Sequence, residues 1–142
     1  MTVIVCPLDA AVDACRVHAA SHVVSLLAPP AAAPDFDDGA SRLLLSFNDI
    51  VAPAAGLVAP DAGHIAQLLA FLDSWDRRSP LLIHCWAGVS RSTAVGYVAA
   101  TLRDGPGSEV ALARRVRQRA PFATPNSLIV ALADERLGRG GA

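Results

Sequence analysis

Short apolar runs alternate with longer amphipathic segments along the chain. The apolar runs are rich in Val, Ile and Leu, and they predict buried β-strands at 2–8, 22–27, 43–47 and 80–85. Apolar residues recur at helical spacing in the longer segments, which predict α-helices at 9–19, 61–78, 92–105, 108–120 and 124–138. Strands that alternate with helices predict a layered α/β fold, with a mostly parallel central sheet flanked by helices.

Nothing in the pattern divides the chain into two parts. The segments 28–39 and 47–60 are rich in Pro and Gly and predict loops within one domain. The chain has 142 residues, of which 53% are hydrophobic and 18% charged, as in a globular protein large enough to bury a core. We therefore expect residues 1–142 to form a single domain.

Charge and cysteine content exclude several classes of function. A net charge of -1 leaves no broad basic field for nonspecific nucleic-acid binding, and no apolar run approaches the roughly 18 residues of a membrane span. The first residues carry acidic rather than basic side chains, unlike a secretory signal. Three cysteines, Cys6, Cys15 and Cys85, are an odd count that argues against a disulfide framework. We expect a cytoplasmic protein that contacts neither nucleic acid nor membrane, and the sequence predicts no oligomeric state.

The segment PLLIHCWAGVSRSTAVG, residues 80–96, carries the clearest candidate chemistry. It places a loop between a predicted strand and a predicted helix, where open parallel sheets bind ligands. Backbone N–H groups on such a turn converge near the positive end of the helix. Gly88 allows close approach of the backbone, and Arg91 supplies a planar, charged fork for two oxygens. The sequence therefore predicts a binding site for a tetrahedral oxyanion.

Cys85 lies at the start of this loop, where the same field stabilises a thiolate. Cysteines beside cations or at helix N-termini have lowered pKa values, so we expect Cys85 to be ionised near neutral pH. A thiolate against a bound phosphate is a nucleophile aimed at phosphorus. A cysteine after a strand is more often a small core residue, but Gly88 and Arg91 at this spacing favour the chemical interpretation.

The loop resembles that of a known family. His84, Cys85, Gly88, Arg91 and Ser92 match HCxxGxxR followed by Ser or Thr, the signature of the cysteine-dependent protein tyrosine and dual-specificity phosphatases. TPNSLIVALADERLG, at 124–138, resembles the closing helix of the compact dual-specificity type. The resemblance covers about residues 42–138, and it implies a three-layer protein tyrosine phosphatase-like fold.

The resemblance implies a role for each matched position. Cys85 would attack phosphorus and carry a phosphocysteine intermediate, Arg91 would clamp the equatorial oxygens, and Ser92 would ease departure of the sulfur. His84 and Asn126 would support the loop without touching substrate. No cofactor and no metal is implied. The backbone amides of the phosphate cradle would be those of Trp86, Ala87, Gly88, Val89, Ser90 and Arg91.

A general acid must also protonate the leaving oxygen. The family places an aspartate on a mobile loop upstream of the cysteine, and Asp49 in SFNDIVAP fits that position. Asp61 is the alternative, but it stands where a helix N-cap is expected, which accounts for it. A turn-forming role in an Asn-Asp pair competes with catalysis for Asp49 as well.

These features favour a phosphatase that acts on protein phosphotyrosine or another aryl phosphate. The loop contains no lysine, whereas family members that act on inositol phosphates often have basic residues there. A non-catalytic phosphopeptide-binding module is one alternative. An arsenate reductase or rhodanese-like sulfur enzyme is another, and a resolving cysteine would have to be Cys6 or Cys15. The run ARRVRQR, at 113–119, either docks an acidic substrate or reflects the helix dipole alone.

Overall fold

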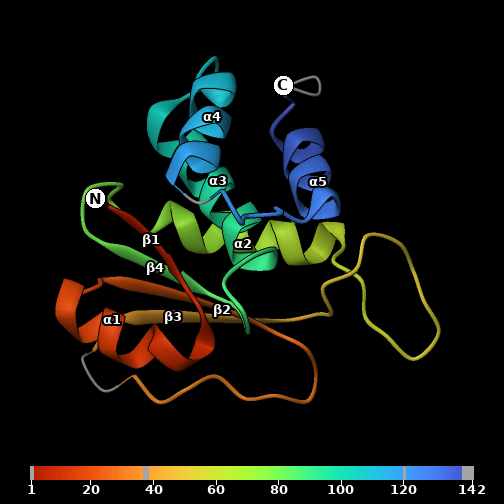
Figure 1. Ribbon diagram of the computed structural model, residues 1–142, viewed down its shortest axis with the longest axis horizontal. Coiled ribbons are helices and arrows are strands. Elements are labelled where there is room, and N and C mark those ends of the chain that lie inside the picture. Colours follow the sequence, from red (N-terminus) through yellow and green to blue (C-terminus); the bar gives the residue numbers. More distant parts are fainter. Residues whose placement is uncertain (1, 37–38, 120, 139–142) are drawn as a thin grey trace.

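The computed structural model describes residues 2–36, 39–119 and 121–138 (Figure 1). The strands within these residues are β1 (Val3–Cys6), β2 (His22–Leu27), β3 (Ser41–Ser46) and β4 (Leu81–His84). The helices are the short 3₁₀ helix η1 (Leu8–Ala10), α1 (Ala11–His18), α2 (Ala62–Asp73), α3 (Arg91–Asp104), α4 (Glu109–Arg119) and α5 (Ser127–Leu137).

The four described strands form one parallel sheet in the order β1-β4-β2-β3. β4 is central, and Leu81 lies in register with Val3 of β1 on one side and with His22 of β2 on the other. Helix α1 covers one face of the sheet, and α2, α3, α4 and α5 lie beyond the other face (Figure 1). The predicted three-layer α/β architecture with a parallel central sheet is confirmed.

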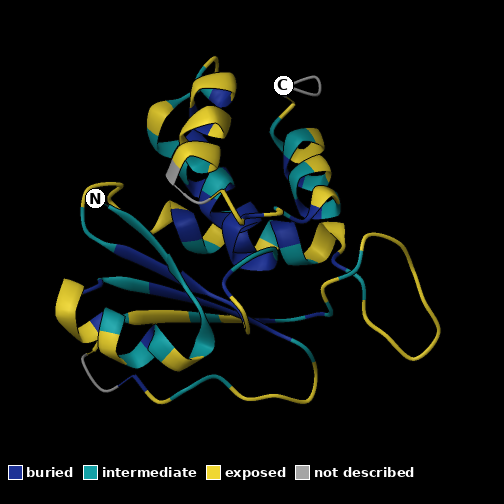
Figure 2. Ribbon diagram, viewed as in Figure 1, coloured by how far each residue is buried: buried dark blue, intermediate teal, exposed yellow. Residues whose placement is uncertain are grey.

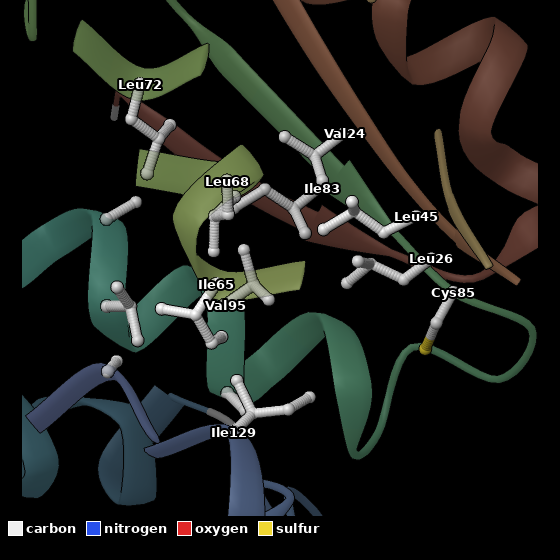
Figure 3. Close-up of a cluster of buried hydrophobic side chains, with 14 of the residues drawn as sticks. Val24, Leu26, Leu45, Ile65, Leu68, Leu72, Ile83, Cys85, Val95 and Ile129 are labelled. Carbon is white, nitrogen blue, oxygen red and sulfur yellow. The ribbon is translucent and has the colours of Figure 1, made fainter. Parts of the chain in front are cut away.

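The main hydrophobic core lies between the sheet and the larger group of helices. Figure 3 shows side chains of β2, β3 and β4 meeting side chains of α2, α3 and α5. Helix α2 contributes the stripe Ile65, Leu68 and Leu72, whose spacing places all three on one face of the helix. Each such buried side chain stabilises the fold by about 1.5–3 kcal/mol.

A second, smaller cluster lies on the α1 face of the sheet. Ala11 and Cys15 of α1 pack there with Val23, Leu82 and Phe36, and all five are buried. Figure 2 shows that buried residues concentrate along the central strands and α3, whereas α4 is largely exposed. The sheet is therefore covered on both faces, as parallel sheets require.

Several element boundaries differ from the sequence-based ranges for local reasons. The first strand ends at Cys6, and Pro7 is the N-cap of the 3₁₀ helix η1 that follows. Helix α2 ends at Asp73, and the following turn is closed by the Asp76 carboxylate, which accepts from the N–H groups of Arg78 and Ser79. The last helix begins at Ser127 rather than 124, since Pro125 disfavours a helical residue before it and Asn126 is the N-cap. The predicted strand 43–47 lies at Ser41–Ser46. Residue 120, the last of the predicted helix 108–120, lies outside the described residues, as do residues 1, 37–38 and 139–142 of the predicted domain.

A search of the described helices finds none with the length and apolar character needed to cross a membrane.

The core stripe of α2 is tested by truncating Leu68. We expect Leu68→Ala to lower the free energy of unfolding by about 2–5 kcal/mol, since the fully buried side chain leaves a cavity. The measurement is urea denaturation followed by circular dichroism. Leu44→Ala is the matched control, because Leu44 is 39% exposed and its truncation should cost about 0.5 kcal/mol or less. Equal losses for the two variants would contradict the assignment of the core.

Candidate active site

The loop from Cys85 to Ser90, here called the Cys85 loop, joins the central strand β4 to the start of α3. In Figure 3, Cys85 lies at the edge of the main core cluster, where β4 passes into this loop. Because β4 lies between β1 and β2, the loop emerges from the middle of the sheet at its carboxyl edge. This position is where open α/β sheets hold ligands.

The Cys85 sulfur is surrounded by hydrogen-bond partners. Sγ lies 3.1 Å from the hydroxyl oxygen of Ser92, and the Gly88 N–H donates to it at 3.2 Å. Burial by itself raises the pKa of this thiol. The Ser92 hydroxyl, the backbone amides of Ser92 and Gly88, and the charge of Arg91 outweigh burial, so the pKa of Cys85 lies below its ordinary value. The loop therefore stabilises a thiolate.

Arg91 places a cation at the base of the same loop. Its side chain is only 8% exposed, and Nη1 donates to the carbonyl oxygen of Phe47 at 3.1 Å. Nε is buried, and no partner for it is found among the described residues. A buried guanidinium N–H without a partner is costly, and a bound oxyanion would satisfy it.

Gly88 allows the loop to pack directly on the end of β1. Its φ is +74°, and a Cβ at this position would lie 2.8 Å from the backbone nitrogen of Pro7 and 2.9 Å from the carbonyl carbon of Cys6. The Leu8 N–H also donates to the carbonyl oxygen of Trp86 at 3.1 Å. The β1 terminus thus supports the loop from behind, which explains why this position needs glycine.

His84 connects the loop to the strand behind it. Its Nε2 lies 2.7 Å from the hydroxyl oxygen of Ser25 on β2, and its Nδ1 lies 3.3 Å from the carbonyl oxygen of Cys85. Burial lowers the pKa of His84, and the bond to Cys85 opposes this shift only in part. A neutral, fully buried imidazole bonded on both sides is a positioning group.

Asp49 lies against the Cys85 loop although it is far from it in sequence. The Ser90 hydroxyl and the Asn126 amide nitrogen each donate to Asp49 Oδ1 at 2.8 Å. Asn126 Nδ2 also donates to the carbonyl oxygen of Ile50. Asp49 is nevertheless exposed, so its carboxyl group borders the loop and faces solvent.

Asn126 links three segments. Its N–H donates to the carbonyl oxygen of Ser90, and its Oδ1 accepts from the N–H groups of Leu128 and Ile129 as the N-cap of α5. Its amide nitrogen holds the Asp49 segment. One side chain therefore connects the Cys85 loop, the upstream loop and the last helix.

Asp61 performs the capping role expected from its sequence position. It is the N-cap of α2, and its Oδ1 accepts from the His64 N–H at 3.0 Å while His64 Nδ1 accepts from the Asp61 N–H. This reciprocal pair is a capping box with histidine in place of the usual glutamate. Asp49, by contrast, contacts the Cys85 loop directly.

Three features of the site had weak signals or none in the sequence. Ser25 is the single polar residue among the buried positions of β2, and that position could have indicated a partner for His84. The Phe47 carbonyl that accepts from Arg91 is a backbone group without a sequence signal. The hydrogen bond from the Ser90 hydroxyl to Asp49 joins two loops that are far apart in the sequence.

Trp86, which is 72% exposed, and Ala87 form the outer part of the Cys85 loop.

Cys6 and Cys15 belong to the opposite face of the sheet from Cys85. Both pack in the α1 cluster, whereas Cys85 packs in the main core on the α2 and α3 side. Burial, followed by the charges of Cys85 and Asp9, raises the pKa of Cys6 to about 11. The described residues contain no cluster of His, Cys, Asp or Glu arranged to hold a metal ion.

The need for glycine at position 88 is tested by Gly88→Ala. The added Cβ would force the loop away from Cys6 and Pro7, and we expect orthovanadate affinity to fall by about a hundredfold, as for other small displacements of reacting groups. Isothermal titration calorimetry measures this affinity. Gly56→Ala is the matched control, since Gly56 has a similar φ of +75° with nothing within 4 Å. It should cost about 1–2 kcal/mol of stability and leave the affinity unchanged; equal affinities for the two variants would refute the close approach.

The lowered pKa of Cys85 is tested by its rate of alkylation with iodoacetamide as a function of pH. We expect the rate to reach half its plateau below the ordinary thiol range, and Ser92→Ala to move that midpoint upward, because a hydrogen bond to the sulfur is lost. Peptide mapping separates Cys85 from Cys6, whose pKa of about 11 keeps it protonated. Ser127→Ala, at an exposed position, is the control. An unchanged midpoint in Ser92→Ala would contradict the proposed cause.

Comparison with known proteins gives matches in structure but not in sequence. No protein-family model and no curated protein matches the sequence. The human tyrosine phosphatase-like serine/threonine/tyrosine-interacting protein matches with a TM-score of 0.72 and 18% identity, over 96% of this chain and 91% of that one. Human DUSP28 matches with a TM-score of 0.69 and 18% identity, over 94% and 89%. The Yvh1 phosphatase domain from Chaetomium thermophilum matches with a TM-score of 0.69 and 18% identity, over 99% and 94%.

These matches extend over nearly the whole chain, and at this level of identity they establish the fold alone. The central parallel sheet and the Cys85 loop at its carboxyl edge agree with that assignment. The chain has the dual-specificity phosphatase-like fold of the cysteine-dependent protein tyrosine phosphatases.

Proposed function

We propose that residues 1–142 form one phosphatase domain that hydrolyses phosphomonoesters through a phosphocysteine intermediate. The observation that carries this proposal is the arrangement around Cys85 and Arg91. A thiol with a lowered pKa lies in the same loop as a buried guanidinium whose Nε has no partner among the described residues. A phosphate bound there would place phosphorus against a nucleophile and its oxygens against a cation.

The proposed reaction has two steps. In the first, the Cys85 thiolate attacks phosphorus, the bond from phosphorus to the ester oxygen breaks, and protonated Asp49 gives its proton to the leaving oxygen. In the second, water attacks phosphorus, the Asp49 carboxylate takes a proton from that water, and the bond from phosphorus to sulfur breaks. The departing thiolate is received by the Ser92 hydroxyl and the Gly88 N–H, which already lie within hydrogen-bond distance of the sulfur.

The contacts of Asp49 support its role as the acid. Both described hydrogen bonds to its side chain reach Oδ1, from Ser90 and from Asn126. Within the described part of the chain, Oδ2 accepts no hydrogen bond, which leaves it to carry the transferred proton. The two donors would hold the carboxyl group beside the loop during both steps.

The outer part of the Cys85 loop favours an aryl phosphate. Exposed Trp86, which follows Cys85 in the sequence, offers an aromatic surface, and Arg91 is the single Lys or Arg in the segment from His84 to Ser92. A monoanionic or dianionic phosphate on an aromatic alcohol suits such a loop better than a polyphosphorylated inositol. We therefore propose protein phosphotyrosine as the substrate class, with small aryl phosphates as surrogates.

A non-catalytic phosphopeptide-binding module is the second candidate. One observation favours it: the two hydrogen bonds to Asp49 Oδ1 also describe a purely structural tie between loops. In that case the Cys85 loop would bind phosphate without turnover. A sulfur-transfer or arsenate-reducing enzyme is less favoured, because Cys6 and Cys15 pack on the other face of the sheet.

The proposal is tested by turnover of a phosphotyrosine peptide and of p-nitrophenyl phosphate without added metal. We expect Cys85→Ser to abolish activity on both substrates. Asp49→Asn should lower kcat on the peptide by about 10² to 10⁴, the usual contribution of a general acid. Asp49→Asn should lower kcat less on p-nitrophenyl phosphate, because p-nitrophenolate is a stable anion that departs without being protonated.

Asp61→Asn is the matched control for the acid. It removes the charge from the α2 cap, and we expect it to leave kcat on both substrates unchanged, with a stability cost of about 1 kcal/mol at most. A wild-type chain that binds orthovanadate and turns over neither substrate would replace the phosphatase with the binding module. Equal losses for Asp49→Asn and Asp61→Asn would remove Asp49 from the mechanism.

A further inference from the structure

A groove of about 870 Å³ lies between the edge strand β1 and helices α3 and α4, and it reaches the back of the Cys85 loop at Gly88. β1 is an edge strand of the sheet, α3 packs against it, and α4 packs on α3 (Figure 1). Apolar side chains from β1, from α4 and from the turn after α4 line the groove: Val3, Val5, Leu112, Val116 and Phe122. Phe122 is 65% exposed, and together with the other apolar lining it forms part of a contiguous apolar surface.

The floor of the groove depends on the close packing of α3 against β1. A Cβ on Gly96 would lie 2.8 Å from Cγ2 of Val5 and 3.8 Å from Cγ1 of Val3. These two side chains therefore point toward α3, on one side of β1. Because α3 approaches so closely at Gly96, the remaining space opens outward, between the free edge of β1 and α4.

The free edge of β1 presents unpaired backbone groups to this groove. The Leu81 N–H donates to the carbonyl oxygen of Thr2 at 2.7 Å, which shows that Thr2 turns its backbone groups toward β4. Backbone groups alternate in direction along a strand, so Val3 and Val5 turn theirs away from β4. No described strand pairs with β1 on that side. An edge of this kind is a template for another strand.

The charged side chains at the groove are basic. Arg103 and Arg115 both line it, and its described lining contains no acidic residue. Arg103 donates to Asp104 and to the Thr2 hydroxyl. Arg115 is exposed and forms no ion pair within 4 Å among the described residues. The pKa of Asp104 is lowered mainly by its hydrogen bond from Arg103 and to a smaller extent by the charge of Arg115. The basic run at 113–119 in α4 therefore places one of its arginines, Arg115, at the apolar groove.

We propose that this groove binds an extended peptide segment of a partner protein, with alternating apolar and acidic side chains, which adds to β1 as a further strand. Its backbone would pair with the outward groups of Val3 and Val5, as in β-strand addition. Its apolar side chains would enter the groove, and an acidic side chain would meet Arg115.

Two other occupants fit these observations less well. A second copy of this chain paired through β1 would bring two basic α4 helices to the same face of one sheet, and β1 itself carries no acidic residue. An anionic lipid would match Arg115 and the apolar lining but would leave the backbone groups of Val3 and Val5 unpaired. A peptide with acidic residues satisfies the edge, the apolar lining and the charge together.

The test uses the full chain and a fluorescein-labelled peptide in which Val alternates with Glu, read by fluorescence anisotropy. The comparison peptide has Lys in place of every Glu. We expect the acidic peptide to bind at least about tenfold more tightly than the basic one. Methylation of alternate backbone nitrogens on the edge that faces β1 should weaken binding by about tenfold, because it blocks strand pairing. Neither peptide contains phosphate, so the result is independent of the proposed phosphatase activity.

Arg115→Glu should weaken binding of the acidic peptide by about tenfold or more, with turnover of p-nitrophenyl phosphate unchanged. Arg114→Glu is the matched control, since Arg114 is exposed on the same helix outside the groove, and it should change binding by less than about twofold.

Three results would overturn the proposal. They are equal binding of the acidic and basic peptides, equal binding of the methylated peptide, and equal effects of Arg115→Glu and Arg114→Glu. Binding to vesicles of anionic phospholipid without binding of the acidic peptide would assign the groove to a membrane surface instead. Sedimentation as a dimer whose dissociation constant changes with Arg115→Glu and not with Arg114→Glu, again without peptide binding, would assign it to a second copy.

Discussion

The burial of Arg91 is the constraint on which the rest of the site depends. A guanidinium that is 8% exposed must find compensation inside the protein, since removing a charge from water is costly. The Phe47 carbonyl and the negative charge favoured on Cys85 supply part of it. The same need makes the loop receptive to an anion, and it couples the ionisation of the sulfur to the position of the arginine. The Cys85 sulfur and the Arg91 guanidinium are therefore one electrostatic unit.

Contacts from several distant segments of the chain hold the Cys85 loop in place. The end of β1 supports the loop through Gly88, and the imidazole of His84 bridges it to β2. Asn126 ties it to the last helix and to the segment that carries Asp49. Such pre-organisation lets binding energy act on the reacting groups instead of ordering the loop. It also explains why the site needs nearly the whole length of the chain.

The layered fold and the loop were predictable because both are encoded locally. Apolar runs and helical periodicity predict strands and helices, and Cys85, Gly88 and Arg91 lie within one short turn whose geometry follows from their spacing. Contacts between distant segments were not predictable in the same way. Two hydrogen bonds depend on how loops meet in three dimensions, which no spacing within one segment encodes. In one the Ser90 hydroxyl donates to Asp49, and in the other Arg91 donates to the Phe47 carbonyl oxygen. Asn126 was accessible only through the resemblance of its Pro-Asn pair.

The loop that carries Asp49 has a closed neck. The Asn48 N–H donates to the carbonyl oxygen of Val58, and the Val58 N–H donates to Asn48 Oδ1, while every residue from 51 to 58 is exposed. These two hydrogen bonds between Asn48 and Val58 hold the base of the loop next to Asp49, and the exposed residues 51–58 form a tip without packing constraints. Insertions, deletions and substitutions in the tip are therefore separable from the chemistry beneath it. The exposed tip can therefore change in sequence and length from one such chain to another while the Cys85 loop stays unaltered.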